Sequence, residues 1–247
     1  MTNGIKNGQG TMKYENGNVY TGEWKNDERH GQGKMIYADG HVYEGGYEND
    51  YKQGQGTMKY EDGRVYSGEW RGGRRHGQGM MKYEDDDVYT GEWKNHTKHG
   101  RGKMTYTIGR VYEGEYEKDE RHGQGTMKYE DDDVYTGEWK NHKMHGYGTM
   151  TYTIGGDVYN GYWKGGKQHG YGEMTYRGGD VYKGYWKDDR KHGYGERTCY
   201  DNGNVYEGNW KDCKRHGLGR VKYANGNVYV SEWKDGEDSP QIGRAHV

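Results

Sequence analysis

The sequence has no phenylalanine, a single proline and two cysteines among its 247 residues, and only 29% of its residues are hydrophobic. So little apolar material excludes a thick buried core, and a composition this polar is also found in disordered chains. Yet 15% of the residues are aromatic, and their strict spacing favours a thin ordered sheet whose core is its own aromatic stripe. Pro240 lies outside the repeating part, so no proline interrupts the expected strands.

Other absences limit the function. No apolar run approaches the roughly 18 residues of a spanning helix, and residues 1–10 lack the apolar segment of a signal peptide. The formal charge of -2 gives no net attraction to nucleic acid, so we expect no nucleic-acid partner. Cys199 and Cys213 are expected to be free thiols of a cytoplasmic protein.

One pattern, Tyr-x-Gly-x-aromatic, recurs every 23 residues, with two steps of 24. Its first tyrosines are Tyr20, Tyr43, Tyr66, Tyr89, Tyr112, Tyr135, Tyr159, Tyr182, Tyr206 and Tyr229. A fixed period in this range indicates an array of one supersecondary unit. We expect the array to span residues 1–234, with partial first and last repeats, and a polar tail at residues 235–247. Residues 242–247 match nothing in the repeats, and we interpret them as a non-native end.

Each unit is predicted to be a β-hairpin. Alternation of β-branched or aromatic residues with polar ones favours a strand from Val19 to Lys25 and another from Gly33 to Tyr37, joined by a loop from Asn26 to Gly31. Asn16-Gly17 favours a two-residue type I′ turn between units. The extra residues of the two longer steps are expected in a turn at 153–157 and in a strand bulge at 195–200. The predicted fold is all-β, an elongated single-layer antiparallel meander of about twenty strands.

The alternation also assigns faces, because successive side chains of a strand point to opposite sides. Tyr20, Gly22 and Trp24 share one face, and Thr21 and Glu23 the other. We expect the aromatic face mainly to hold the sheet together and additionally to form a groove for a peptide or helix of a protein partner. The predicted groove residues are Tyr20, Trp24, Tyr43, Tyr47, Tyr66, Trp70, Tyr89, Trp93, Tyr112, Tyr116, Tyr135, Trp139, Tyr159, Trp163, Tyr182 and Trp186.

The later repeats differ from the others on the solvated face. Where most copies have Glu or Gln, these have tyrosine, at Tyr147, Tyr162, Tyr171, Tyr185 and Tyr194. Exposed tyrosines are enriched in protein interfaces, so these five are candidate interface residues. Cross-strand packing that stiffens the sheet is the alternative interpretation.

Charge is divided between the two edges of the sheet. The Asn-Gly turn edge is acidic, whereas the loops that close the hairpins carry an excess of basic residues. The candidate basic edge comprises Arg71, Arg74, Arg75, Lys94, Lys98, Lys140, Lys143, Lys164, Lys167, Lys211, Lys214 and Arg215. Such an edge attracts anionic lipids or acidic peptides. Solvated loops also carry charge without a function.

Recurring His and Glu residues suggest no chemistry. The His columns at His30, His76, His99, His122, His145, His169, His192 and His216 should stand about 9.5 Å apart, too far to share a zinc ion, and each ring is expected to bond its own loop. The Glu columns lack the asymmetric cleft of a catalytic pair. We therefore expect no catalytic, metal-binding or cofactor-binding residue.

The repeat resembles a known family. Tyr-x-Gly-x-Trp followed by His-Gly-x-Gly, as at residues 30–33, 76–79 and 216–219, is similar to the MORN repeat. The resemblance implies hairpin arrays in non-catalytic scaffolds at cytoskeletal, ciliary or membrane-associated structures, with end-to-end homodimers. Two alternatives stay open: a module targeting phosphoinositides or anionic lipids, and the regulatory part of a lipid kinase or SET-type methyltransferase.

Overall fold

The computed structural model describes residues 4–239, and it contains 21 β-strands in antiparallel pairs. Those residues form no helix, and hence none long and apolar enough to cross a membrane. The prediction of an all-β antiparallel meander is confirmed. The end interpreted as non-native, residues 242–247, lies outside the described residues, whereas part of the predicted tail forms β21 (Glu237–Ser239).

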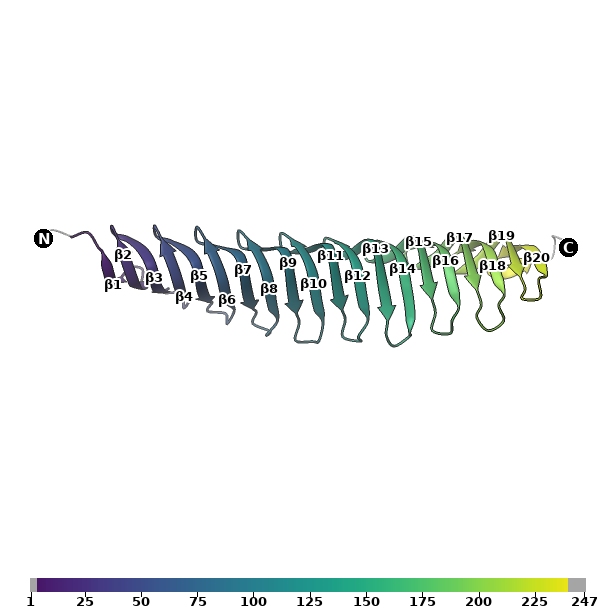
Figure 1. Cartoon of the computed structure of the whole chain (residues 1–247), viewed down its shortest axis with the longest axis horizontal. Helices are drawn as coiled ribbons and strands as arrows, with labels where there is room; N and C mark the ends of the chain where they lie inside the picture. Colours follow the sequence, from purple (N-terminus) through teal and green to yellow (C-terminus); the bar gives the residue numbers. More distant parts are fainter. Residues whose placement is uncertain (1–3, 240–247) are drawn as a thin grey trace. The chain divides into compact units, whose positions relative to one another are not determined.

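The chain divides into two compact units, residues 1–120 and 121–247. The first contains β1 (Gly8–Lys13), β2 (Val19–Lys25), β3 (Glu28–Ile36), β4 (Val42–Glu48), β5 (Tyr51–Lys59), β6 (Val65–Arg71), β7 (Arg74–Lys82), β8 (Val88–Lys94), β9 (Thr97–Thr105) and β10 (Val111–Glu117). The second contains β11 (Glu120–Lys128), β12 (Val134–Lys140), β13 (Lys143–Tyr152), β14 (Asp157–Lys164), β15 (Lys167–Thr175), β16 (Val181–Lys187), β17 (Arg190–Thr198), β18 (Val205–Lys211), β19 (Lys214–Lys222), β20 (Val228–Lys234) and β21. Within each unit, each strand pairs with the strands next to it in sequence (Figure 1).

The predicted loop at residues 26–31 is wrong. Lys25 pairs directly with Glu28, and the two residues between them, Asn26 and Asp27, have φ values of 50° and 67°. Two left-handed residues in a two-residue connection define a type I′ turn, whose twist matches that of the flanking strands. The second strand of the hairpin therefore begins at Glu28, and His30 lies in a strand.

The connection between repeats is also not the predicted type I′ turn. At Asn16-Gly17 only Gly17 has a positive φ, 87°, and its N–H donates to the Tyr14 carbonyl at 3.0 Å. This geometry is a type I turn followed by a left-handed glycine. The Asn16 side chain accepts a hydrogen bond from the N–H of Asn18 at 3.1 Å, as asparagine does in turns.

Both extra residues lie in turns between strands. Residues 153–156 connect β13 to β14, as predicted. Residues 199–204 connect β17 to β18, and those two strands pair in regular register from Thr198 and Val205 onward. The predicted strand bulge at 195–200 is therefore wrong, because a turn accepts an extra residue without disturbing the ladder.

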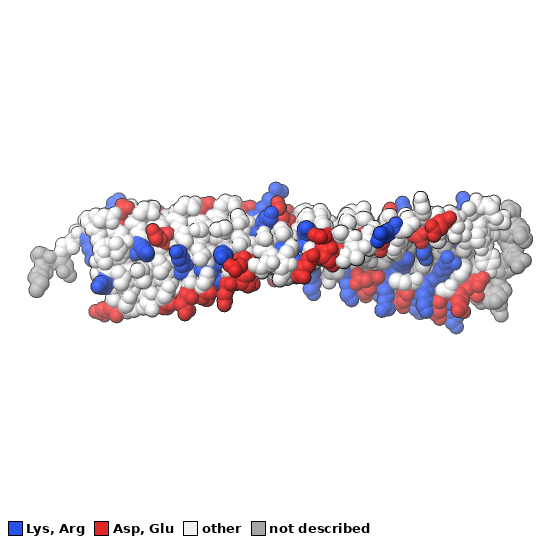
Figure 2. Space-filling view, turned by 90° about the horizontal axis from the view of Figure 1, so that it is seen from below, with Lys and Arg blue, Asp and Glu red and all other residues white. Residues whose placement is uncertain are grey.

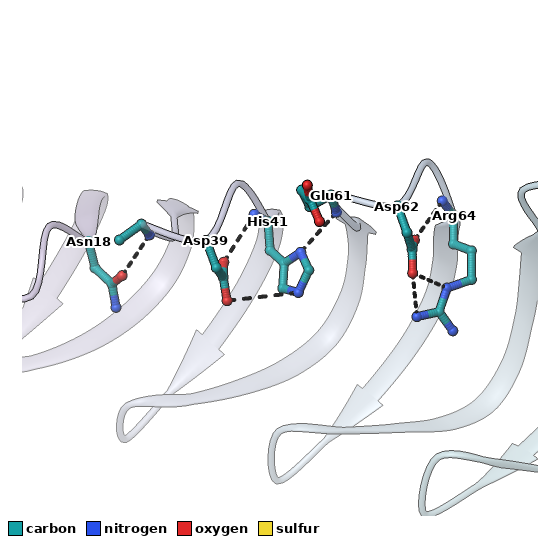
Figure 3. A network of polar contacts seen from close by, with 7 residues as sticks. Asn18, Asp39, His41, Glu61, Asp62 and Arg64 are labelled. Carbon is teal, nitrogen blue, oxygen red and sulfur yellow. Dashed lines mark hydrogen bonds and ion pairs between the residues drawn. The ribbon is translucent and has the colours of Figure 1, made fainter.

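The turns between repeats are tied to one another by side chains (Figure 3). Asn18 accepts a hydrogen bond from the backbone N–H of Ala38 at 2.9 Å, and His41 Nδ1 accepts one from that of Glu61 at 2.9 Å. In the next turn, Asp62 and Arg64 form an ion pair at 2.7 Å. The two hydrogen bonds keep successive hairpins in register along this edge of the first unit, and the ion pair lies within its own turn.

Candidate protein-interaction surfaces

The aromatic face is a ladder of interlocked rings. Tyr66 is fully buried and packs edge-on against Trp70 of its own strand at 5.2 Å and against Trp93 of the next repeat at 5.3 Å. Its hydroxyl donates to the Glu69 carbonyl at 2.9 Å, and Trp93 Nε1 donates to the Gly79 carbonyl at 3.1 Å. T-shaped ring pairs and hydrogen-bonded polar atoms stabilise a thin core. Because the Tyr66 hydroxyl and the Trp93 N–H already donate to backbone carbonyls, these groups are not free to donate to a ligand.

The structure buries every predicted groove residue. Each has at most 7% of its surface exposed. The rings therefore lie inside the sheet's own packing, and a segment bound along this face would touch the side chains that cover them. The role of this face in binding stays a prediction.

The first unit has a hollow on its polar face, opposite the rings. It has a volume of about 960 Å³ and is lined by Gln32, Gln55 and Gln78 together with Lys34 and Glu44. These side chains point away from the rings. A concave surface is thus present where the sequence predicted only a solvated face.

A row of basic side chains covers the rings. Their position over the aromatic face was not predicted from the sequence. Arg75 lies over Trp93 at 4.5 Å, Lys52 over Trp70 at 4.9 Å and Arg215 over Tyr206 at 4.5 Å. Burial lowers the pKa of Lys52 to about 8, and burial also lowers that of Lys191 to about 8. The signal in the sequence was a basic residue two positions before the first Gly of Gly-x-Gly, because the two-residue turn places that position on the aromatic face.

The predicted basic edge consequently separates into two groups. Arg75, Lys98 and Arg215 are half-buried over rings. The other nine residues are exposed at strand ends, on the face opposite the rings. These nine are Arg71, Arg74, Lys94, Lys140, Lys143, Lys164, Lys167, Lys211 and Lys214.

The five candidate interface tyrosines form a row on the outer face of β13 to β17. Each has 49–52% of its surface exposed. Tyr147 faces Tyr162 with ring centroids 5.4 Å apart, and Tyr171 faces Tyr185 at 5.7 Å. These two pairs pack edge-on, and each of the five rings presents about half of its surface to solvent. The interface role and the stiffening role both stay predictions.

The recurring Glu stabilises a bulge. Gly68 pairs with Gly79, but Trp70 pairs with Arg75, so the two strands have different numbers of residues between these pairs. Glu69 accepts a hydrogen bond from the backbone N–H of Gln78 at 2.8 Å inside this bulge. Glu23, Glu92 and Glu138 make the equivalent bond. This carboxylate column is therefore structural.

Where tyrosine or asparagine replaces that Glu, the neighbouring histidine changes. Nδ1 of His169, His192 and His216 is buried without a hydrogen-bond partner. The expectation that each ring bonds its own loop is wrong for these three, because their Nδ1 atoms make no hydrogen bond. Within residues 4–239 no group of three or more His, Cys, Asp or Glu side chains is arranged to hold a metal ion.

Replacing Glu69 by alanine tests the bulge. We expect the free energy of unfolding to fall by about 1–2 kcal/mol, because a backbone N–H loses a charged acceptor. Glu69→Gln keeps an acceptor and should lose less. Denaturant titration measures both, with Glu84→Ala, at an exposed position, as control. Equal midpoints for Glu69→Ala and Glu84→Ala would contradict this role.

The fold and the surface together define a class of protein. It is an open, single-layer β-repeat protein whose core is a ladder of buried Tyr and Trp rings, and its five added tyrosines lie on the outer face. The chain belongs to the MORN repeat family. The family model, described as "MORN repeat", matches residues 1–19, 20–42, 43–63, 66–88, 89–109, 112–134, 135–157, 159–181, 182–204 and 206–228. No curated protein matches the sequence.

Solved structures are similar to this chain at low identity. The TCP10 domain of Danio rerio CPAP in complex with a peptide of Danio rerio STIL is 11% identical, over 94% of this chain and 96% of that one, with a TM-score of 0.50. Another structure of the Danio rerio CPAP TCP10 domain is 12% identical, over 83% and 95%, with a TM-score of 0.46. At this identity the likeness shows the fold alone.

Proposed function

We propose that the chain is a non-catalytic scaffold that binds other proteins through the outer face of its MORN sheet. The observation that carries the proposal is the row of five half-exposed tyrosines on β13 to β17. Tyrosine supplies a large, rigid contact area with a polar tip, which suits protein interfaces. The similar CPAP domain, solved in complex with a peptide of another protein, supports the binding of a protein segment.

The absence of catalysis belongs to the same proposal. Four Glu residues of the recurring column accept backbone N–H groups, which gives those carboxylates a structural task. Repeated copies in similar surroundings do not form the asymmetric pair of carboxylates that acid–base catalysis needs. We infer a cytoplasmic protein associated with cytoskeletal or membrane structures, and homodimerisation through the tyrosine row is a second use of the same surface.

Anionic-lipid binding is the second candidate function. It is favoured by the exposed lysines and arginines at the strand ends of the second unit. Figure 2 shows Lys and Arg side chains among acidic ones over the C-terminal strands. Polybasic surfaces attract anionic headgroups within a Debye length. A salt-sensitive response to anionic vesicles that disappears when Lys164 and Lys167 are replaced by glutamine would favour this alternative.

Affinity capture from the source lysate tests the scaffold. The double variant Tyr162→Glu/Tyr185→Glu should lose most of the protein that the unchanged chain captures, because it puts charge into the tyrosine row. The control is Tyr51→Glu/Tyr200→Glu, which changes two exposed tyrosines elsewhere. Light scattering of both variants reports any dimer. Capture unchanged by the Tyr162/Tyr185 variant would count against the proposal.

A further inference from the structure

The second unit carries a second row beside its tyrosines. At four successive hairpins, both residues that flank the type I′ turn are basic and pair directly across the strands. The pairs are Lys140 with Lys143, Lys164 with Lys167, Lys187 with Arg190, and Lys211 with Lys214. In the first unit the described pairs at this position are mixed, with one basic pair, Arg71 with Arg74.

Most of these basic side chains have no ion-pair partner among the described residues. Like charges directly opposite on neighbouring strands destabilise a sheet, and all eight side chains are exposed. Arg190 has an ion pair, with Asp212 at 3.5 Å. The remaining seven have none among the described residues. Such a row binds an anionic partner more readily than an isolated lysine, because its charges lie close together.

The basic row and the tyrosine row lie side by side on one face. Lys164 follows Tyr162 by two residues in β14, and Lys187 follows Tyr185 by two in β16, so each lysine points to the same side as its tyrosine. On the side of the tyrosine row away from the basic pairs, Glu173 forms an ion pair with Lys183 at 3.1 Å, so its charge is neutralised. A ligand on the tyrosines thus has its anionic side directed toward the basic pairs.

The spacing of the rows selects the conformation of the ligand. Each tyrosine pair and each basic pair recurs every two strands, which is about 9.6 Å at ~4.8 Å per strand. A polyproline II helix repeats every three residues, or about 9.3 Å. An α-helix returns to the same side after seven residues, about 10.5 Å, and a fully extended strand after two, about 6.8 Å. The polyproline II period fits best.

Hydrogen bonding agrees with this choice. The rows lie on the face of the sheet, where its backbone groups are already paired, so strand addition has no partners there. A polyproline II segment has no internal hydrogen bonds and offers its carbonyls to side-chain donors. The hydroxyls of Tyr147, Tyr162, Tyr171 and Tyr185 have no hydrogen-bond partner among the described residues and are available for them.

We propose that the outer face of β13 to β17 binds an acidic protein segment in the polyproline II conformation. Its prolines lie on the tyrosine row, and its carboxylates, three residues apart, face the basic pairs. The inference rests on the scaffold function proposed above and identifies the class of partner segment. It requires about three turns of the ligand to cover the tyrosine row.

Titration calorimetry of the full chain with synthetic peptides tests this inference. The probe is four repeats of Glu-Pro-Pro, about 37 Å long. It should bind, and more weakly as salt rises. Four repeats of Gln-Pro-Pro lack the charge, and four of Glu-Gly-Gly lack the stiffness, so each should bind at least about tenfold more weakly. Equal binding of the Glu-Gly-Gly peptide would refute the polyproline II conformation of the ligand. No binding of the Glu-Pro-Pro peptide would refute the whole proposal.

Two variants locate the site. Tyr171→Gln/Tyr185→Glu inserts the residue types that the first unit has at these positions, such as Gln78 and Glu69, so the fold is expected to persist. Lys164→Gln/Lys167→Gln removes one basic pair. Each should weaken Glu-Pro-Pro binding at least about fivefold with an unchanged melting temperature. Arg71→Gln/Arg74→Gln is the matched control, and an equal loss there would refute the site.

The lysate experiment separates the two proposals. If tyrosine-dependent capture succeeds and the Glu-Pro-Pro peptide does not bind, this inference fails and the scaffold function stands. If capture is also independent of the tyrosines, both fail. Vesicles containing phosphatidylserine are a further probe: binding that requires both rows and that excess peptide does not displace would assign the face to membranes and overturn the proposal.

Discussion

Replacing Gly79 by alanine is expected to destabilise the first unit by about 3 kcal/mol or more. A Cβ at this position would overlap the hydroxyl of Tyr66 and lie 2.7 Å from its Cε2. That ring cannot move aside, because Trp70 and Trp93 pack against it at 5.2 and 5.3 Å. Overpacking of a filled core costs about 1–3 kcal/mol, and more when the obstacle is rigid. Denaturant unfolding followed by tryptophan fluorescence measures the loss.

The matched control for Gly79 is Gly178→Ala. Gly178 has no atom within 4 Å of its ideal Cβ and no left-handed φ, so alanine is expected to leave the midpoint nearly unchanged. The pair separates loss of space from loss of chain flexibility, since both variants stiffen the unfolded chain equally. Similar unfolding midpoints for the two variants would show that the Tyr66 ring can move aside, and that the ring ladder is packed less tightly than the ring distances indicate.

Alkaline pH is expected to unfold the protein steeply. Burial raises the pKa of Tyr20 to about 12 and that of Tyr206 to about 12, and it raises the pKa of Tyr66 further. In the unfolded chain tyrosine ionises near pH 10. Stability from these rings is therefore complete below pH 10 and is lost as pH rises above it, at about 1.4 kcal/mol per pH unit for each ring. The same direction holds for Tyr43, Tyr89, Tyr135, Tyr159 and Tyr182.

Two lysines act in the opposite direction over a lower pH range. Burial lowers the pKa of Lys52 and of Lys191 to about 8, whereas an unfolded lysine titrates near 10.4. The folded state then binds fewer protons, so their contribution to stability rises with pH between about 8 and 10. Stability should thus increase between pH 8 and 10 and collapse beyond pH 10, because the buried tyrosines outnumber these lysines.

Phenolate absorbance and circular dichroism, recorded against pH, measure this behaviour. We expect the phenolate signal of the buried rings to appear together with the loss of strand structure. Lys52→Met, which inserts the residue found at the equivalent Met144, should reduce the rise between pH 8 and 10 and leave the collapse in place. Ionisation of all tyrosines near pH 10 with the sheet intact would contradict the burial of their hydroxyls.

Some of the fold was predictable residue by residue. The strand from Val19 to Lys25 was predicted with its observed bounds, because its alternation of apolar and polar residues is unbroken. The strand from Glu28 to Ile36 was predicted to start too late. Its alternation is interrupted at Gly31 and Gln32, where the bulge lies, and an interrupted pattern is indistinguishable from a loop in sequence.

The turns were assigned to the wrong edges for a related reason. Asn-Gly is the commonest type I′ signal, yet here it forms a type I turn with one left-handed glycine, while Asn26-Asp27 forms the type I′ turn. Turn type depends on how many residues remain unpaired between two strands. That number is fixed only when the strands pair in a definite register. The direct pairing of the basic residues was hidden by this error, because Lys164 and Lys167 face each other only across a two-residue turn.

The sequence by itself determined the repeat, the all-β meander, the family and the side of the sheet on which each ring and each added tyrosine lies, since period and parity are local properties of the chain. Only the tertiary structure decided the bulges, the turn types, the burial of the rings and the pairing of like charges. Those features depend on register between strands, and register is set by the combined packing of Tyr, Trp and Gly across neighbouring hairpins rather than by any one segment.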